Sequence, residues 1–281
     1  MIFIVPGKTV KSEKDTSLNK DNFLKIATFN IHFNEPGTKK NSWDKRKDVL
    51  YQLVSREYPD IIGFQEVYTH SHKENRDRVQ FNWIKKKFKD YLIISNQETV
   101  DHASSLPILY KKDKLKVINR GYFFFTDTPE VKPELKKGQF IVYFCNWAYF
   151  YNIKEEYYFY VFNIHLNGRK NKNNIKSARI IVDRINRLKK KNDGLIITGD
   201  FNEFYNSKTL SIFYNNGLKN VINGFWPASL HLFIGLAIIP RIDHILINNF
   251  FQIEEYHLSR YKVKEQYPSD HYPIFTVLKK R

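Results

Sequence analysis

The tetrapeptide Phe29-Asn30-Ile31-His32 is repeated in the second half of the chain as Phe162-Asn163-Ile164-His165. Each copy is followed by a polar loop, an amphipathic stretch, a hydrophobic run and then a carboxylate. That carboxylate is Glu66, 36 residues after Asn30, in the first half, and Asp200, 37 residues after Asn163, in the second. Two like strand–helix–strand halves pack sheet on sheet with their helices outside, so the repeat predicts a layered α/β sandwich.

The hydrophobic periodicity around this repeat predicts an alternation of strands and helices. Strands are expected at residues 26–33, 61–64, 106–110, 117–125, 140–150, 157–166, 195–198, 242–247 and 272–278. Helices are expected at residues 42–58, 78–88, 175–188 and 207–214. Residues 1–24 are polar and aperiodic and are expected to form a flexible lead-in, with one domain over residues 25–281.

The composition of the 281-residue chain indicates a partner without naming it. Lys and Arg total 46 against 29 Asp and Glu, a formal net charge of +17. This excess favours a polyanionic partner, such as nucleic acid, a phosphorylated small molecule or an anionic membrane surface. The alternative is a proteome rich in Lys, Asn, Ile, Tyr and Phe. The single cysteine, Cys145, excludes an internal disulfide framework and a thiolate metal cluster.

Residues 222–240 form the most hydrophobic stretch, but Pro227, Ser229 and His231 interrupt it. It therefore falls short of the roughly 20 unbroken apolar residues of a membrane span. We expect a buried or substrate-facing loop here and no stable membrane insertion. The apolar start, Met1 to Val5, is too short for a signal peptide, which favours a cytoplasmic location. With no coiled coil or repeat array in the sequence, a monomer is expected.

Polar side chains that are suited to chemistry follow several of the predicted strands. They are Asn30, Gln65-Glu66, His165, Gly199-Asp200-Phe201-Asn202, Asp243-His244 and Ser269-Asp270-His271. Adjacent Asp and His residues offer a carboxylate–imidazole pair that orients a general base. Oxygen ligands without cysteine suit Mg²⁺ or Mn²⁺. Taken singly, each segment also fits a loop hydrogen bond, a buried core histidine or a turn cap; their joint occurrence at strand ends favours one site.

These segments, taken in order, resemble the endonuclease/exonuclease/phosphatase superfamily, which includes deoxyribonuclease I, apurinic nucleases, deadenylases, inositol polyphosphate 5-phosphatases and bacterial sphingomyelinases. The resemblance rests on residues 27–31, 59–67, 162–166, 197–202, 241–245 and 267–273 and spans about Lys25 to Leu278. Gly121-Tyr122-Phe123-Phe124-Phe125 and Asn146-Trp147-Ala148 resemble a bacterial branch of largely uncharacterised members. The resemblance implies a deoxyribonuclease I-like, four-layered α/β sandwich, with two mixed β-sheets packed face to face and helices on both outer faces.

The resemblance also implies roles for the residues. Glu66 would be the principal metal ligand, with Asn30 and Asp270 beside a Mg²⁺ or Mn²⁺ ion. Asp200 would align or deprotonate the attacking water, Asn202 would hold a phosphate oxygen, and His165 would stabilise charge on phosphorus. Asp243 would orient His271, an acid/base or phosphate clamp, and Tyr110 would lie at the phosphate.

The sequence departs from the family pattern at three positions. Ser104 stands where an acidic partner of His165 is usual, so either Asp101 substitutes for that partner or the His165 imidazole is held less firmly. Phe140-Ile141-Val142-Tyr143 lacks a usual basic residue, and Ser229 stands for a usual threonine. The implied activity is a metal-dependent phosphodiesterase or nuclease, with nucleic acid as the favoured substrate. A phospholipid or phosphoinositide phosphohydrolase is the first alternative, and a non-catalytic basic binding module the second.

Overall fold

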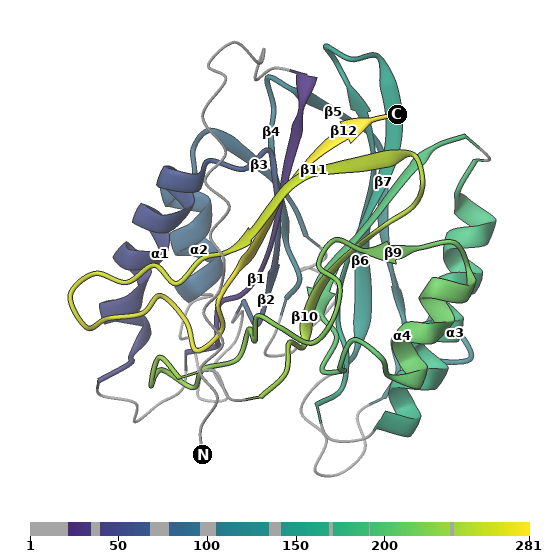
Figure 1. Cartoon of the computed structure of the whole chain (residues 1–281). Helices are drawn as coiled ribbons and strands as arrows, with labels where there is room; N and C mark the ends of the chain where they lie inside the picture. The colour runs from purple at the N-terminus through teal and green to yellow at the C-terminus, as the bar shows by residue number, and fades with distance from the viewer. Residues whose placement is uncertain are drawn as a thin grey trace.

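The computed structural model describes residues 22–34, 40–67, 79–95, 105–134, 142–168, 171–190, 192–236 and 239–281. Within these ranges the chain forms two mixed β-sheets that pack face to face between two pairs of helices (Figure 1). Of the flexible lead-in expected at residues 1–24, residues 1–21 lie outside the described part of the chain.

Each sheet has six strands. The first has the order β11-β12-β1-β2-β4-β3, built from β1 (Leu24–Asn30), β2 (Ile61–Gln65), β3 (Tyr91–Ile94), β4 (Ile108–Lys111), β11 (Phe251–Leu258) and β12 (Ile274–Lys280). The second has the order β5-β6-β7-β8-β10-β9, built from β5 (Leu115–Phe124), β6 (Phe144–Asn152), β7 (Tyr157–His165), β8 (Gly194–Asp200), β9 (Lys219–Asn220) and β10 (Asp243–Ile247).

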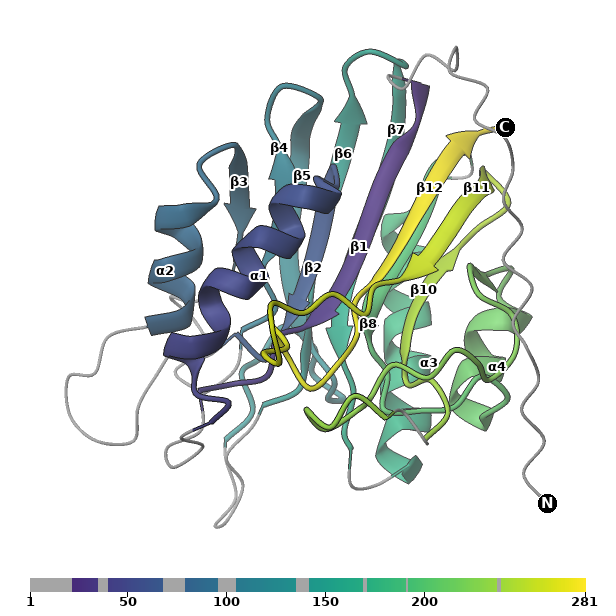
Figure 2. The ribbon, with the colours of Figure 1, turned by 60° about the vertical axis from the view of Figure 1, so that its left-hand side comes forward.

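Two helices cover the outer face of each sheet. Figures 1 and 2 show α1 (Trp43–Glu57) and α2 (Val79–Lys87) on the first sheet and α3 (Asn171–Leu188) and α4 (Lys208–Asn215) on the second. The four-layered α/β sandwich is therefore confirmed. No helix in the described part of the chain is long and apolar enough to span a membrane.

The sequence repeat corresponds to a structural repeat. β1 runs parallel to β2, and β7 runs parallel to β8. Each parallel pair is flanked by antiparallel strands, β12 and β4 in the first sheet and β6 and β10 in the second. Because parallel strands end at the same edge of a sheet, both halves of the repeat deliver their carboxylates to one end of the sandwich.

Three hydrophobic clusters hold these layers together. One lies between the sheets and includes Ile26, Ile61, Phe159, Ile196 and Ile274. Another packs α3 and α4 on the second sheet, and a third packs α1 and α2 on the first. The central strands are buried on both faces, which is why they appear in the sequence as continuous apolar runs.

A polar bridge joins the two sheets beneath the strand ends. The Gln65 side-chain amide donates to Asn163 Oδ1 at 2.7 Å, and the Thr198 hydroxyl donates to the same oxygen at 3.1 Å. Gly63 makes room for this bridge, since a Cβ there would lie 2.2 Å from Thr198 Oγ1. The side-chain oxygen of Asn163, the repeat counterpart of Asn30, thus has its hydrogen-bond donors inside the sandwich. Asn163 therefore helps to join the two sheets.

The element boundaries differ from the predicted ones in a few places. The strand expected at 140–150 begins at Phe144, with residues 140 and 141 outside the described part. Three strands, β3, β9 and β11, were not predicted. β3 is apolar but only four residues long, and β9 has two residues. β11 lies at a sheet edge, and its partly exposed, charged sequence lacks the apolar pattern of a buried strand.

Candidate active site

Strand register brings the predicted polar residues together at one end of the sandwich. Asp200, at the end of β8, lies opposite His165 on β7 and opposite Asp243 on β10. Asn30, at the end of β1 in the facing sheet, donates from Nδ2 to Asp200 Oδ2 at 2.9 Å and to Glu66 Oε1 at 3.1 Å. One amide therefore ties together the terminal carboxylates of both repeats.

Three residues at these strand ends have a left-handed backbone. His32, Glu66 and Asn202 have φ values of 56°, 56° and 50°. Residues other than glycine rarely adopt this left-handed backbone conformation, and such residues concentrate at functional sites. Here the left-handed turn follows the last strand residue in β2 and comes soon after it in β1 and β8.

Asp200 is an unusual carboxylate. It is 1 % exposed, and burial, with the nearby charge of Asp243, raises its pKa to about 6. Its Oδ1 accepts the Asn202 backbone N–H at 2.9 Å, while Oδ2 faces Asn30 and two imidazoles. These are the surroundings of a general base that works near neutral pH.

His271 forms a buried pair with Asp243. Its Nδ1 lies 2.7 Å from Asp243 Oδ2, and its Nε2 lies 3.9 Å from Asp200 Oδ2. Burial alone would lower the pKa of His271, but the carboxylates of Asp243, Asp270 and Asp200 raise it well above its usual value. His271 is therefore a cation at neutral pH, and its free Nε2–H is directed toward Asp200.

Ser229 fixes the backbone beneath this pair. Its hydroxyl oxygen accepts the backbone N–H groups of Ile242 and Asp243, each at 3.2 Å. The serine at the usual threonine position thus keeps a hydrogen-bonding hydroxyl next to Asp243. The other carboxylate oxygen, Asp243 Oδ1, is buried without a hydrogen-bond partner among the described residues.

His165 lies on the opposite side of Asp200 from the Asp243–His271 pair. Its Nε2 is 3.7 Å from Asp200 Oδ2 and 3.9 Å from Glu66 Oε1. The ring makes no hydrogen bond with any residue in the described ranges. Asp101 and Ser104, the predicted candidates for orienting it, lie outside those ranges.

Asp270 and Glu66 lie on either side of His32. The Nδ1 of His32 is 3.3 Å from Asp270 Oδ2 and 3.8 Å from Glu66 Oε2. Burial would raise the pKa of Asp270, but the charges of His271 and His32 lower it, so this carboxylate is ionised. His32 was not among the predicted site residues, although the repeat pairs it with His165 in the sequence.

The donors at this end of the sandwich fit a hard divalent cation. Ligand atoms of Glu66, His165 and Asp200 lie within 4.8 Å of one another, and Asp270 adds a carboxylate beyond His32. Asn30 differs from the predicted ligand geometry, because its Oδ1 accepts the His32 backbone N–H at 3.0 Å and its nitrogen faces the carboxylates. In this orientation Asn30 aligns the carboxylates that can bind a metal.

Asn202 and Tyr110 differ from their predicted places. The Asn202 side-chain amide donates to the Leu166 carbonyl at 2.8 Å, so it holds the β7 end. Tyr110 is buried in the core between the sheets, pairs with Ile61 at the far end of β2, and packs on Phe150. The prediction of Tyr110 at the phosphate is therefore corrected: β4 runs antiparallel to β2, which carries Tyr110 away from Glu66.

His244 is a structural histidine despite its position beside Asp243. Strand alternation directs it to the opposite face of β10, where Nδ1 and Nε2 bond the Asn220 amide and the Glu203 carbonyl at 2.8 and 2.9 Å. Burial lowers its pKa to about 3, so it is neutral. Of the two Asp-His segments, Asp243, Asp270 and His271 belong to the candidate site, and His244 does not.

Arg46 is a second residue that the sequence did not reveal as part of the site's support. It is fully buried in α1 and donates to the carbonyls of Asn41, Ile31, His32, Phe33 and Pro268. Burial lowers its pKa to about 10, which leaves it charged at neutral pH. One guanidinium thus joins the loop after β1 to the loop that carries Asp270.

We expect Arg46→Met to lower the free energy of unfolding by about 2–4 kcal/mol, since several buried carbonyls lose their donor at once. Urea denaturation measures this loss. Arg56→Met, on an exposed position of the same helix, is the matched control and should stay within about 0.5 kcal/mol of the wild type. Equal effects of the two substitutions would contradict the role of Arg46.

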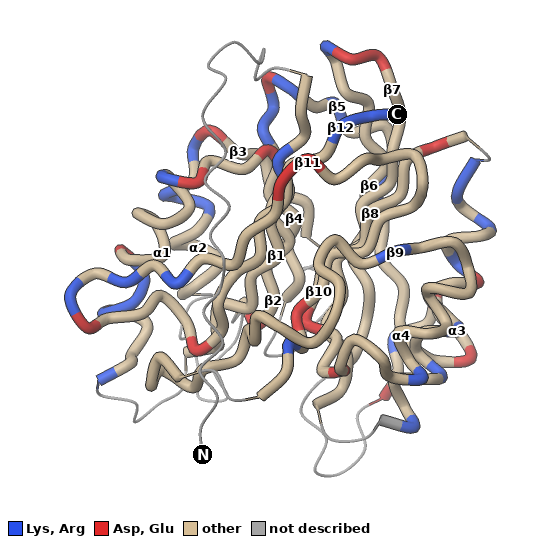
Figure 3. The backbone as a smooth tube through the Cα atoms, viewed as in Figure 1, with Lys and Arg blue, Asp and Glu red and all other residues tan. Residues whose placement is uncertain are grey.

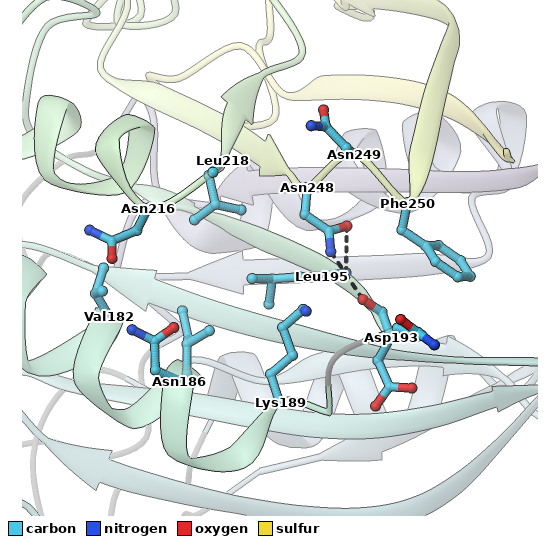
Figure 4. A pocket seen from close by; sticks show the side chains of 13 residues that line it. Val182, Asn186, Lys189, Asp193, Leu195, Asn216, Leu218, Asn248, Asn249 and Phe250 are labelled. Atoms are coloured by element: carbon cyan, nitrogen blue, oxygen red, sulfur yellow. Dashed lines mark hydrogen bonds between the residues drawn. The ribbon is translucent and has the colours of Figure 1, made fainter.

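A cavity at the opposite end of the second sheet contains none of these residues. It has a volume of about 580 Å³ and lies between the C-terminal ends of α3 and α4 and the start of β8 (Figure 4). Asn186, Asn216 and Lys189 line it, and Asn248 is bonded to the backbone of Leu195 and Asp193. It has no cluster of carboxylates and imidazoles, so the candidate active site is the group around Asp200.

Comparison with known proteins agrees with this geometry. Residues 27–271 match the Endonuclease/Exonuclease/phosphatase family. An uncharacterised protein, L388, of Acanthamoeba polyphaga mimivirus is 24% identical over 253 residues, covering 84% of this chain and 91% of its own.

Solved structures show the same fold. A mannosyl-6-phosphatase of Bacteroides thetaiotaomicron is similar with a TM-score of 0.79 and 24% identity, covering 91% of this chain and 99% of that one. TDP2 of D. rerio, in complex with single-strand DNA product, is similar with a TM-score of 0.71 and 16% identity, covering 92% and 100%.

Proposed function

The chain belongs to the Endonuclease/Exonuclease/phosphatase family, and we propose that it is a divalent-metal-dependent phosphodiesterase whose active site is the cluster around Asp200. The observation that carries this proposal is the convergence of Glu66, Asp200, His165 and the Asp243–His271 pair at one end of the sandwich. Two unlike environments, a carboxyl with a raised pKa and a buried imidazolium, are the surroundings that acid–base chemistry requires.

Glu66 and Asp270, aligned by Asn30 and His32, would hold the metal ion. Oxygen donors without a thiolate favour Mg²⁺, with Mn²⁺ as a substitute. When bound, the ion would neutralise charge on the phosphate oxygens.

The side chains divide the remaining work of an in-line displacement. Asp200 orients a water molecule and takes its proton as the water oxygen bonds to phosphorus and the ester P–O bond breaks. The leaving oxygen takes a proton from solvent and departs as the alcohol. Protonated His271 donates a hydrogen bond from Nε2 to a phosphate oxygen, and Asp243 keeps it charged. His165 stabilises the developing charge from the other side.

A panel of substrates tests the activity itself. The protein, with Mg²⁺ or with EDTA, is incubated with plasmid DNA, RNA oligonucleotides, sphingomyelin, inositol phosphates and a soluble aryl phosphodiester. We expect metal-dependent release of product from at least one of them. Absence of Mg²⁺-dependent hydrolysis of every substrate would favour a non-catalytic binding module.

Nucleic acid is the substrate class that the net charge of +17 supports. If it is the substrate, the observed affinity must fall steeply with salt, because phosphate contacts release counterions. A phosphorylated lipid headgroup is the second candidate, and the observation in its favour is the apolar connection between β9 and β10 beside the site.

A further inference from the structure

The connection between β9 and β10 carries no charged residue before Arg241, which lies close to the start of β10. From Asn220 to Pro240 there is no Lys, Arg, Asp or Glu, and Figure 3 shows the described part of this segment in tan. Within it, Leu232, Ile234 and Leu236 are 56 %, 66 % and 69 % exposed. Leu236 and Ile234 are the two most exposed large hydrophobic residues in the described part of the chain, and clustered exposed apolar side chains mark interaction sites.

Within residues 231–236, the more buried residues alternate with exposed ones. His231 is fully buried and its ring stacks on Tyr272 at 3.9 Å, and the Tyr272 hydroxyl donates to the Gly235 carbonyl at 3.1 Å. The backbone N–H groups of His231 and Leu232 both donate to the Asp270 carbonyl, at 2.8 and 3.2 Å. The backbone that carries the exposed Leu232 is thus held by hydrogen bonds to Asp270, which also supplies a site carboxylate.

The same segment adjoins the active site through Phe233. Phe233 contacts the His32 ring at 5.4 Å, and His32 lies between Asp270 and Glu66. Trp226, 56 % exposed, belongs to the same connection. Its amphipathic ring suits the boundary between water and lipid.

A basic loop lies beside the aliphatic residues. Arg260, Lys262 and Lys264 are exposed on the connection between β11 and β12, with Glu265 as the one acid among them. Arg260 lies over the Tyr272 ring, and Tyr267 of the same connection packs on His231 at 4.6 Å. Figure 3 shows this charged loop next to the uncharged segment.

We propose that Leu232, Ile234 and Leu236, flanked by Arg260, Lys262 and Lys264, form a docking surface for an anionic lipid membrane. Aliphatic side chains offer no aromatic face on which a nucleobase can stack. Aliphatic insertion next to lysine and arginine is, by contrast, how peripheral proteins bind acidic lipid surfaces. The substrate that this surface would present, a phosphorylated lipid headgroup, rests on the proposed function, whereas the docking itself does not.

Vesicle sedimentation in EDTA tests docking without turnover. We expect the protein to bind vesicles of phosphatidylcholine and phosphatidylserine more tightly than vesicles of phosphatidylcholine alone. The triple substitution L232S/I234S/L236S should weaken binding at least about tenfold. R260A/K264A should weaken binding to the anionic vesicles by about fivefold for each charge removed.

The matched control is L92S/I118S/I153S, which removes three exposed apolar side chains, 45–47 % exposed, outside this connection. It should bind as the wild type does. No vesicle binding by the wild type, or wild-type binding by L232S/I234S/L236S, would overturn the proposal. The proposal would also be overturned if L232S/I234S/L236S lost self-association or oligonucleotide binding. Either loss would identify a second copy of the chain or nucleic acid as the partner that binds this surface.

Hydrolysis of a soluble aryl phosphodiester by the wild type, measured in parallel, reports on the proposed function alone. Hydrolysis without vesicle binding would overturn the docking surface and leave the phosphodiesterase standing. Vesicle binding without hydrolysis of any diester would overturn the proposed phosphodiesterase activity and leave the docking surface standing.

Discussion

Asp200→Asn should abolish hydrolysis and at the same time stabilise the metal-free protein. Removing a general base lowers kcat by about 10²–10⁴-fold. Asparagine keeps the shape of the side chain and its bond to the Asn202 backbone N–H, so the fold remains. An inactive variant that is more stable than its parent is the mark of a residue retained for chemistry.

The sign of the stability change follows from the pKa. Asp200 in the folded protein has its pKa raised to about 6, from 3.8, chiefly by burial. The folded state therefore favours the protonated form, and the stability that this carboxyl contributes is present below pH 3.8 and lost as the pH rises through about 6. At pH 7 the ionised group is a cost, and its removal should raise the free energy of unfolding by about 1–3 kcal/mol.

Urea denaturation in EDTA and initial rates with metal measure the two effects. Asp44→Asn is the matched control, because its side chain is 80 % exposed on α1. It should leave the rate unchanged and lower the free energy of unfolding by less than about 1 kcal/mol, because it removes only an exposed pair with Lys47. Wild-type activity in Asp200→Asn, or a loss of stability at pH 7 with a gain at pH 4, would contradict the assignment.

Asp243→Asn should lower kcat by about 10²–10³-fold and shift the alkaline limb of the pH profile to lower pH. Asp243 is the closest of the carboxylates that keep His271 protonated, at 2.7 Å from its Nδ1. Without that charge the pKa of His271 falls, so the imidazolium that clamps the phosphate is lost at a lower pH. A kcat/KM profile from acid to alkaline pH records the shift.

The stability of the pair has the opposite dependence on pH from that of Asp200. A histidine whose pKa is raised on folding stabilises the protein fully below its unfolded pKa of about 6.5 and loses that contribution as the pH rises through the folded value. The stability lost in Asp243→Asn should therefore be larger at pH 6 than at high pH. His271→Gln serves as the comparison: it should be equally inactive but show no alkaline limb from this group. An unshifted limb in Asp243→Asn would contradict the pairing.

The sequence predicted the sandwich because the repeat fixes strand order. Phe29-Asn30-Ile31-His32 and Phe162-Asn163-Ile164-His165 end parallel pairs whose carboxyl ends must lie at one edge, and that edge contains Glu66 and Asp200. What happens beyond the strand ends was harder to predict. Whether the side-chain nitrogen or the side-chain oxygen of Asn30 faces the carboxylates depends on the backbone N–H of His32, which bonds the oxygen. The sequence pattern does not predict this hydrogen bond.

Tyr110 and Arg46 show two further limits. The place of Tyr110 depends on the register of β4 against β2, and a short buried strand does not specify its register in sequence. Arg46 occurs in the predicted helix like any other basic residue, and only the packed fold reveals that its guanidinium bonds backbone carbonyls of two separate loops. β11 was missed because its mixed, exposed sequence lacks the apolar run of a central strand.

The most direct test of the account is the dependence of phosphodiester hydrolysis on metal concentration in the wild type, Glu66→Gln and the control Glu265→Gln, whose side chain is 85 % exposed. Initial rates with a soluble aryl phosphodiester are measured after EDTA treatment, across a Mg²⁺ titration. The account predicts no rate in EDTA, recovery with Mg²⁺, and a metal requirement at least about tenfold higher in Glu66→Gln, with Glu265→Gln following the wild-type curve. Full activity in EDTA, or a Glu66→Gln titration that overlies the wild-type curve, would contradict it.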